Sequence, residues 1–352
     1  MTALRATSLT IGYSGKRNKN VVLERVHLQA SSGELVCLLG PNGIGKSTLL
    51  RTLSKVQPAL SGEVEIEGVS LQRLNRSELA RRVGVVLTER PIIGALPAYR
   101  LVELGRYPHV NWLGQLTAHD HEVVEWAIDA VSARHLAARD TNTLSDGERQ
   151  RFMIARALAQ EPSILLLDEP TAFLDVAARA ELMGLLRRLA RQEHLAIVVS
   201  THDLELALRT ADRVWVILPD RQLYTGAPED MILEGCIQAA FPAETIHFLP
   251  LDRTFRPVIP ARGYASVGGA GLTAGLAEAV LEREGFKVVS DASDSLKVFV
   301  SQGARWEAVI LGNHAAGEGF AALAKFLRDL PEIVPDEGRK AEANRHPNKI
   351  GR

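Results

Sequence analysis

Cysteine is scarce in this chain of 352 residues: only Cys37 and Cys236 occur. Two widely separated cysteines exclude a disulfide framework and are typical of proteins kept in a reducing cytosol. Long apolar runs are lacking too, since the densest, residues 164–167, is followed at once by Asp168, so we expect no bilayer-spanning helix. Residues 1–9 have no long apolar core and are not expected to form a secretory signal.

An excess of charge of either sign is also absent, because the formal net charge is −1. Without a basic stripe, no nucleic-acid partner is expected. The apolar fraction of 46% is ordinary for a globular protein, so the chain can build packed cores. Its length favours about two or three domains.

The most informative stretch is a glycine-rich loop at residues 40–48, which matches the pattern G-x-x-x-x-G-K-[ST] completely. It follows an apolar run at 35–39, which predicts a buried strand, and precedes a predicted helix. Glycines let backbone N–H groups crowd a polyphosphate, and the helix adds unpaired N–H groups and the positive end of its dipole. Lys46 should reach the β- and γ-phosphates, and Ser47 should bind Mg²⁺. The residues expected to bind ATP here are Gly40, Pro41, Asn42, Gly43, Gly45, Lys46, Ser47 and Thr48.

Strands and helices alternate after this loop, which predicts an α/β fold with a parallel sheet and helices on its faces. Buried strands are expected at 83–88, 164–168 and 195–199. Between about residues 91 and 143, prolines and returning helical periodicity predict a mainly helical insertion. Ser145 is a good cap for the helix that follows it.

Three more motifs follow the glycine loop: LSDGERQ at 144–150, LLLDEP at 165–170 and STHD at 200–203. In this order and spacing, the four motifs resemble those of the ABC-type ATPases, over about residues 3–248. LGRYPH at 104–109 and the DGERQ variant at 146–150 are similar to the ATPase subunits of prokaryotic importers of metal chelates: iron–siderophore, haem or cobalamin. The resemblance implies a P-loop ABC-type nucleotide-binding domain that binds ATP and Mg²⁺ and hydrolyses ATP.

The resemblance also implies roles for single residues. Tyr13 matches the aromatic residue that stacks on adenine, although from the residues alone it could be a surface tyrosine of a strand. Asp168 matches the carboxylate that orients the Mg²⁺ shell, and Glu169 the group that polarises the attacking water. His202 matches the histidine that contacts the γ-phosphate, although a lone histidine after a buried strand is more often structural.

A second half-site is implied at Ser145, Gly147 and Glu148. In the family, the helix that begins there points its N-terminus at the γ-phosphate bound by the other subunit. Leu174 and Asp175 match the loop that contacts that subunit. Because this chain holds one copy of each motif, the resemblance implies a homodimer that encloses two ATP molecules.

The sequence departs from the family at one position. The family places a glutamine that contacts Mg²⁺ at the end of the strand expected at 83–88. Thr88 falls there by ungapped count, and Glu89 is next. Either could supply an oxygen to the metal.

The resemblance implies that the helical insertion docks a membrane permease, with Tyr99, Leu101, Leu104, Tyr107 and Trp112 as apolar contact material or as packing of the subdomain. A substrate-binding protein would act indirectly, and the chain would lie on the cytoplasmic face of the cell membrane. The alternative is a soluble ABC ATPase of the repair or translation type, without a membrane partner. A small-molecule P-loop kinase is disfavoured, since it has no use for the LSDGE segment.

We expect the ATPase domain to occupy residues 1–248 and a small accessory α/β domain residues 249–330. Its stretch from Gly269 to Ala274 imitates the dinucleotide pattern G-x-G-x-x-A, but no further Rossmann repeats follow, so a small appendage with a regulatory or dimer-stabilising role is the favoured interpretation. Residues 331–352 are polar and lack periodicity, which predicts a disordered tail.

Overall fold

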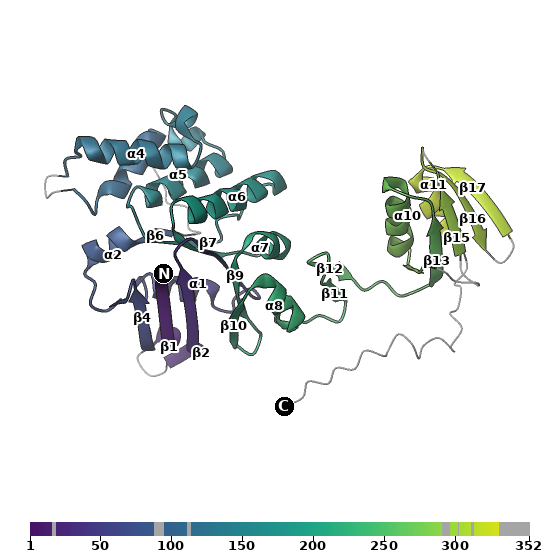
Figure 1. The fold of residues 1–352 in the computed structure, drawn as a ribbon, viewed down its shortest axis with the longest axis horizontal. Coiled ribbons are helices and arrows are strands. Elements are labelled where there is room, and N and C mark those ends of the chain that lie inside the picture. The colour runs from purple at the N-terminus through teal and green to yellow at the C-terminus, as the bar shows by residue number, and fades with distance from the viewer. Residues whose placement is uncertain are drawn as a thin grey trace. The chain divides into compact units, whose positions relative to one another are not determined.

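The computed structural model describes residues 1–15, 19–87, 95–110, 114–290, 296–301, 303–310 and 313–330. The chain divides into two compact units, Met1–Arg256 and Pro257–Arg352. Both contain strands and helices (Figure 1). The α/β class and the small C-terminal α/β appendage are therefore confirmed.

The first unit is built on a six-stranded sheet in the order β10-β9-β3-β8-β7-β6. Neighbours are parallel except β9 and β10. The strands are β3 (Leu35–Leu39), β6 (Val83–Val86), β7 (Ile164–Asp168), β8 (Ala196–Ser200), β9 (Arg213–Ile217) and β10 (Leu223–Gly226). All residues of β3, β7 and β8 are buried, which explains why their sequences read as short continuous apolar runs.

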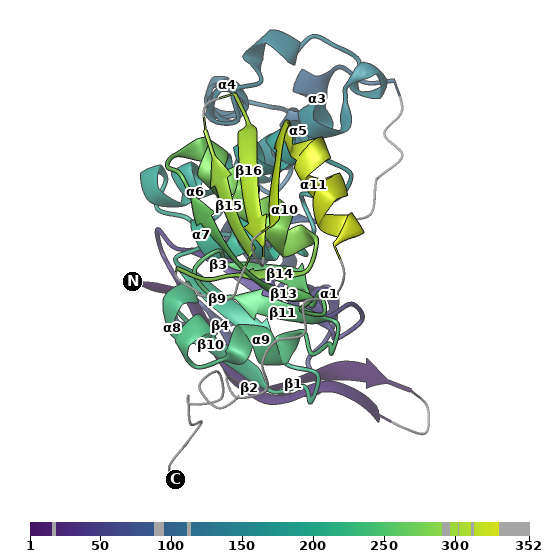
Figure 2. The same ribbon diagram turned by 90° about the vertical axis from the view of Figure 1, so that its right-hand side faces the viewer.

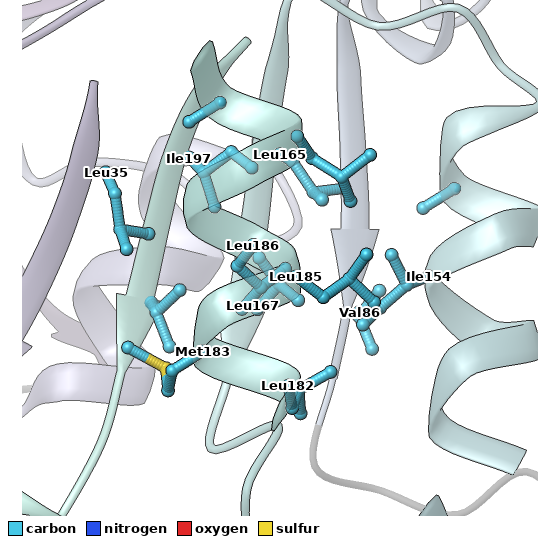
Figure 3. Packing of buried hydrophobic residues seen from close by; sticks show 14 of the residues in the cluster. Leu35, Val86, Ile154, Leu165, Leu167, Leu182, Met183, Leu185, Leu186 and Ile197 are labelled. Atoms are coloured by element: carbon cyan, nitrogen blue, oxygen red, sulfur yellow. The ribbon is translucent and has the colours of Figure 1, made fainter. Parts of the chain in front are cut away.

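Helices cover both faces of this sheet. Leu35 of β3 packs with α6 on one face (Figure 3), whereas Val36 packs with α1 on the other. The helices of the first unit are α1 (Lys46–Leu53), α2 (Arg76–Arg82), α3 (Ala98–Glu103), α4 (Ala118–Ala130), α5 (Asp146–Leu158), α6 (Val176–Gln192), α7 (Leu204–Thr210), α8 (Pro228–Leu233) and α9 (Cys236–Ala240). No helix in the described part of the chain is long and apolar enough to span a bilayer.

A second, antiparallel sheet lies at the start of the chain, in the order β2-β1-β4-β5. Its strands are β1 (Thr2–Ser14), β2 (Lys19–Ser31), β4 (Ser61–Ile66) and β5 (Val69–Ser70). The hydrophobic core on the α1 side of the central sheet includes residues of β1, β2 and β4. Tyr13 lies near the end of β1, so this sheet fixes its place beside α1.

The predicted insertion is helical where the structure describes it. It contains α3, α4 and three short 3-10 helices, η1 (Leu104–Arg106), η2 (Arg134–Leu136) and η3 (Thr141–Thr143). Helix α4 begins at Ala118, where Thr117 and Asp120 form a capping box. Thr88, Glu89 and Trp112 lie outside the described residues.

The first unit extends past residue 248. Strands β11 (Ile246–Leu249) and β12 (Thr254–Pro257) pair with each other. The Phe255 ring packs against the rings of Phe241 and Phe248, at centroid distances of 5.8 and 5.1 Å. These contacts tie this pair of strands to the first unit.

The second unit has a five-stranded sheet in the order β14-β13-β15-β16-β17. Its elements are β13 (Gly263–Gly268), α10 (Leu272–Arg283), β14 (Phe286–Val288), β15 (Leu296–Val300), β16 (Arg305–Ile310), β17 (Asn313–Glu318) and α11 (Phe320–Asp329). Strand β13 is parallel to β14 and β15, while β16 and β17 continue the sheet antiparallel (Figure 2). Residues of α10 and α11 share one hydrophobic core with alternate residues of the strands.

Candidate functional site

The glycine loop connects β3 directly to α1, as the sequence predicts. Gly40, Gly43 and Gly45 have φ angles of 149°, 72° and 118°, in the left-handed region that favours glycine. A Cβ on Gly45 would lie 2.2 Å from Cγ1 of Val22, so no side chain fits there. Gly45 is also the N-cap of α1 and supplies no capping side chain, which leaves the first N–H groups of the helix for an anion.

Lys46 is buried at the start of α1, and its side chain turns back onto the loop. Its Nζ donates hydrogen bonds to the carbonyl oxygens of Gly40 (2.8 Å) and Pro41 (3.1 Å). Burial lowers the pKa of Lys46 below its usual value, while the carboxylates of Glu169 and Asp168 act in the opposite direction. A buried ammonium group next to the loop is suited to meet the negative charge of a polyphosphate.

Asp168 links the loop to the ends of two central strands. Its Oδ1 accepts hydrogen bonds from Ser47 Oγ (3.1 Å) and Ser200 Oγ (2.7 Å). The serine of β8 also accepts a hydrogen bond from the backbone N–H of Glu169, at 2.9 Å. Parallel strands β7 and β8 therefore hold the two carboxylates at the carboxyl edge of the sheet, where ligands bind in open α/β folds.

Glu169 and His202 are in direct contact. Nε2 of His202 lies 2.5 Å from Oε1 of Glu169. Glu169 has a φ angle of 50°, an uncommon value for a residue with a side chain. The structure thus joins Lys46, Ser47, Asp168, Glu169 and His202 in one group, which we call the phosphate-site cluster.

Tyr13 lies beside the start of α1. Its Oη is 3.0 Å from Oγ1 of Thr48, and half of the residue is exposed (50%). An exposed ring anchored next to the glycine loop is placed where it can stack on a planar base. A pocket lined by Tyr13, Arg51 and Leu60 lies next to it.

Ser145 caps α5, as the sequence predicts. Its hydroxyl accepts a hydrogen bond from the N–H of Glu148 (3.3 Å), and Oε2 of Glu148 accepts one from the N–H of Ser145 (2.8 Å). The hydrogen bond that the Ser145 N–H donates to the carboxylate is the largest cause that lowers the pKa of Glu148. Gly147 lies against Leu174 and Ala178. Glu148 also forms an ion pair with Arg139, at 3.7 Å, and Ser145 O accepts a hydrogen bond from the N–H of Arg149, at 2.8 Å.

The side chains of the loop before α6 differ in burial and in their contacts. Asp175 caps α6 by accepting a hydrogen bond from the N–H of Ala178 (2.7 Å), and Leu174 is buried in the core. Phe173 presents a large exposed apolar side chain in this loop (69%), and its φ angle is 68°. The sequence motifs do not identify Phe173, which appears in the sequence only as an aromatic residue in a turn.

The sequence is similar to those of known proteins. Residues 23–172 match the ABC transporter family. The chain is 40% identical to an uncharacterized ABC transporter ATP-binding protein of Methanocaldococcus jannaschii, over 70% of this chain and 83% of that one. It is 37% identical to a probable siderophore transport system ATP-binding protein of Bacillus subtilis, over 68% and 86%.

Solved structures are similar as well. One, assigned to the metal-chelate type of ABC transporter in an inward-facing conformation, has 27% identity and a TM-score of 0.60, over 73% of this chain and 96% of that one. Another is a dimeric ATP-binding cassette with bound ADP and phosphate, at 29% identity and a TM-score of 0.53, over 60% and 93%. The protein therefore belongs to the ATP-binding proteins of ABC transporters and is an ATPase of that family.

Proposed function

We propose that this protein is the ATP-hydrolysing subunit of an importer of metal chelates, of the iron–siderophore, haem or cobalamin class. The phosphate-site cluster is the observation that carries the ATPase part of the proposal. The importer part rests on the LGRYPH segment, on the siderophore transport relative and on the similar transporter of the metal-chelate type.

Hydrolysis of ATP requires positioning and charge stabilisation more than covalent chemistry. In the proposed site, Lys46 exchanges the carbonyls of Gly40 and Pro41 for the β- and γ-phosphates. Glu169 orients the attacking water and accepts its proton, since its backbone N–H is bonded to Ser200 at the strand end and its carboxylate contacts His202. His202, in contact with Glu169, is placed to reach the γ-phosphate, and Tyr13 stacks on adenine.

The residues at the start of α1 fit Mg²⁺. This ion prefers oxygen ligands and is usually held by one or two carboxylates together with substrate phosphates. Ser47 Oγ and Asp168 Oδ1 lie 3.1 Å apart, so a hydroxyl and a carboxylate oxygen already converge. Ser47 would bind the ion and Asp168 would orient its waters, while the ion would add positive charge at the phosphates.

In this proposal, an oxygen of Thr88 or Glu89 binds Mg²⁺ in place of the glutamine that the family usually has there. The test is the Mg²⁺ dependence of turnover in Thr88→Ala and Glu89→Ala. If both variants matched the parent, this part would be wrong.

The working form is a homodimer with two ATP molecules. The cap of α5 at Ser145, with Gly147 and Glu148, forms its hydrogen bonds within its own turn, and a second copy would bring this helix start to the γ-phosphate. The similar dimeric cassette with ADP and phosphate supports this arrangement. Leu174 and Asp175 belong to the loop that contacts the second copy.

The partners are integral membrane permease subunits and, indirectly, a substrate-binding protein, and the chain lies on the cytoplasmic face of the membrane. Leu104 and Tyr107 are exposed on the insertion and offer apolar contact, whereas Leu101 is buried and packs the subdomain. The first unit is the ATPase domain, and the second is an accessory domain.

Purification of the chain from native membranes in mild detergent tests the proposal. A co-purifying polytopic permease, together with ATP hydrolysis, is the expected result. A chain that hydrolyses ATP but retains no membrane protein would contradict the importer assignment and favour a soluble ABC ATPase.

A further inference from the structure

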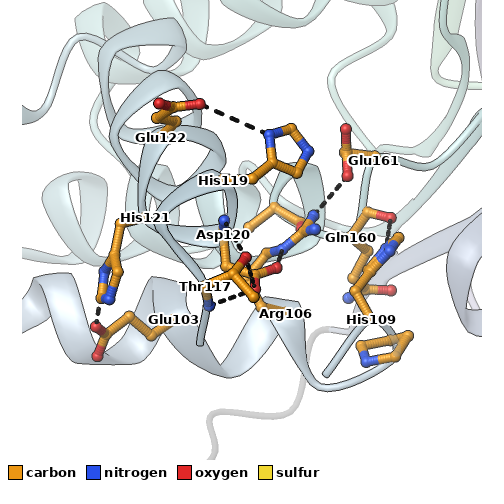
Figure 4. Close-up of polar contacts among 12 residues, drawn as sticks. Glu103, Arg106, His109, Thr117, His119, Asp120, His121, Glu122, Gln160 and Glu161 are labelled. Atoms are coloured by element: carbon orange, nitrogen blue, oxygen red, sulfur yellow. Dashed lines mark hydrogen bonds and ion pairs between the residues drawn. The ribbon is translucent and has the colours of Figure 1, made fainter. Parts of the chain in front are cut away.

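Arg106 is the most deeply buried charged side chain of the helical insertion, with 2% of its surface exposed. Its Nε donates to Oδ1 of Asp120 at 2.8 Å (Figure 4). Its Nη1 donates to the carbonyl oxygen of Ala159 at 2.8 Å and to Oε2 of Glu161 at 2.6 Å. One guanidinium group therefore joins the start of α4 to the end of α5. The rigid fork of arginine suits this, since a lysine ammonium is a single point charge.

Asp120 completes the connection on the α4 side. It accepts hydrogen bonds from the N–H of Thr117 (2.8 Å) and from the Thr117 hydroxyl (2.7 Å), in addition to the bond from Arg106. A buried ion pair whose other hydrogen-bonding groups are also satisfied is rigid, because breaking it would leave a buried charge unpaired.

The neighbours of Arg106 contact the same end of α5. A Cβ on Gly105 would lie only 2.1 Å from the carbonyl oxygen of Arg156, so the two backbones are already in close approach. Nε2 of His109 lies 2.9 Å from the carbonyl oxygen of Gln160 (Figure 4). The same segment also contacts α2, because the Pro108 carbonyl accepts a hydrogen bond from Nε of Arg81 in that helix (2.8 Å).

Two residues of the same segment are exposed. Leu104 is 41% exposed and Tyr107 is 68% exposed, and they flank Gly105 and Arg106 in the sequence. The segment 104–109 therefore presents apolar side chains outward while its buried residues are fixed to α5.

Helix α5 spans 13 residues and begins at the Ser145 cap. At 1.5 Å per residue, it is about 20 Å long. A displacement applied to its last turn is carried to its first turn, because the hydrogen-bonded backbone of a helix is stiff over this length.

We propose that Arg106 is a positioning residue that transmits movement of the permease-docking segment, through the last turn of α5, to the Ser145 end that completes the site of the other copy. This inference rests on the proposed function, because it needs a permease and a dimer. Arg106 touches neither nucleotide nor permease in this account. It sets how far permease movement changes the rate of hydrolysis.

Arg106→Lys is the test, since lysine keeps the positive charge beside Asp120 but cannot hold Asp120 and the end of α5 together. The readout is ATP hydrolysis by the chain alone and by the chain reconstituted with its co-purifying permease. Hydrolysis by the chain alone should stay within about twofold of the parent, while the stimulation by the permease should fall roughly five- to tenfold, a usual range for coupling between sites. Permease co-purification should be unchanged, whereas Tyr107→Ala should reduce it.

Two further variants serve as a second test and as a control. Glu161→Gln removes the charge from a surface carboxylate that is 44% exposed, so it leaves the buried pair intact and should lower stimulation in the same direction. Arg134→Gln breaks the exposed pair with Asp129 in the same subdomain and should behave as the parent.

The outcomes separate the two proposals. A parent protein that no permease stimulates would overturn the proposed function, and this inference with it. A stimulated parent with an equally stimulated Arg106→Lys variant would overturn only the role of Arg106. So would a variant that loses permease co-purification as Tyr107→Ala does, since Arg106 would then act in docking.

Discussion

Replacing Gly105 by alanine tests the close contact between the helical insertion and α5. A Cβ there would lie 2.1 Å from the carbonyl oxygen of Arg156 and 2.9 Å from Cβ of Ala159, although such atoms essentially never come within 3.0 Å. The segment must therefore retreat from α5 by about 1 Å, and overpacking of this kind costs about 1–3 kcal/mol. At roughly 2–4 °C per kcal/mol for a domain of this size, Gly105→Ala should lower the Tm by about 2–12 °C.

Gly184→Ala is the matched control. Gly184 lies within α6, and a Cβ there would meet no atom within 4 Å. Because alanine is favoured over glycine inside a helix by about 0.5–1 kcal/mol, this variant should be slightly stabilised. Thermal unfolding of the full chain measures both, with the transition of the first unit assigned by hydrogen exchange in α5. A Gly105→Ala variant as stable as the parent would refute the reasoning.

Three further predictions follow from the site and its supports. Burial alone would raise the pKa of Asp120, but its hydrogen bonds with Thr117 and Arg106 hold it at about 2. Asp120→Asn should therefore be less stable than the parent above about pH 4, and this difference in the free energy of unfolding should disappear toward pH 2. Urea unfolding at descending pH measures the difference. A difference that stayed constant with pH would contradict the assigned cause. Lys46→Ala should lose ATP binding in calorimetry, and unchanged affinity would remove Lys46 from the phosphate site. Phe173→Ala should weaken the proposed ATP-dependent dimer in light scattering, since Phe173 presents a large exposed apolar side chain in the loop proposed to contact the second copy; an equally stable dimer would exclude it from the interface.

Local patterns in the sequence predicted the parts of the fold that depend on neighbouring residues. The strand at 35–39, the glycine loop and α1 form as expected, since a short apolar run, glycines and a helix start specify them locally. The Ser145 cap is confirmed together with its partner Glu148, since a serine and a glutamate three residues apart form a capping box.

Elements that depend on tertiary pairing were not predictable in this way. Strand β17 (Asn313–Glu318) has few residues that favour strands, and it forms by pairing with the edge of β16. Helix α10 begins at Leu272, directly after Gly271, which offers no capping side chain that would mark this start in the sequence. Arg106 meets Ala159 and Glu161, which lie more than fifty positions away in the sequence, so no local pattern indicates that it is buried and paired.

The most direct test of the central claim is single-turnover ATP hydrolysis by Glu169→Gln, measured together with ATP binding. Glutamine keeps the shape of the side chain but cannot accept the proton of the attacking water, so hydrolysis should fall by about a hundredfold or more while ATP still binds. Glu181→Gln, at an exposed position of α6 paired with Arg151, is the matched control and should hydrolyse ATP as the parent does. A Glu169→Gln variant that binds ATP and hydrolyses it at the rate of the parent would contradict the account.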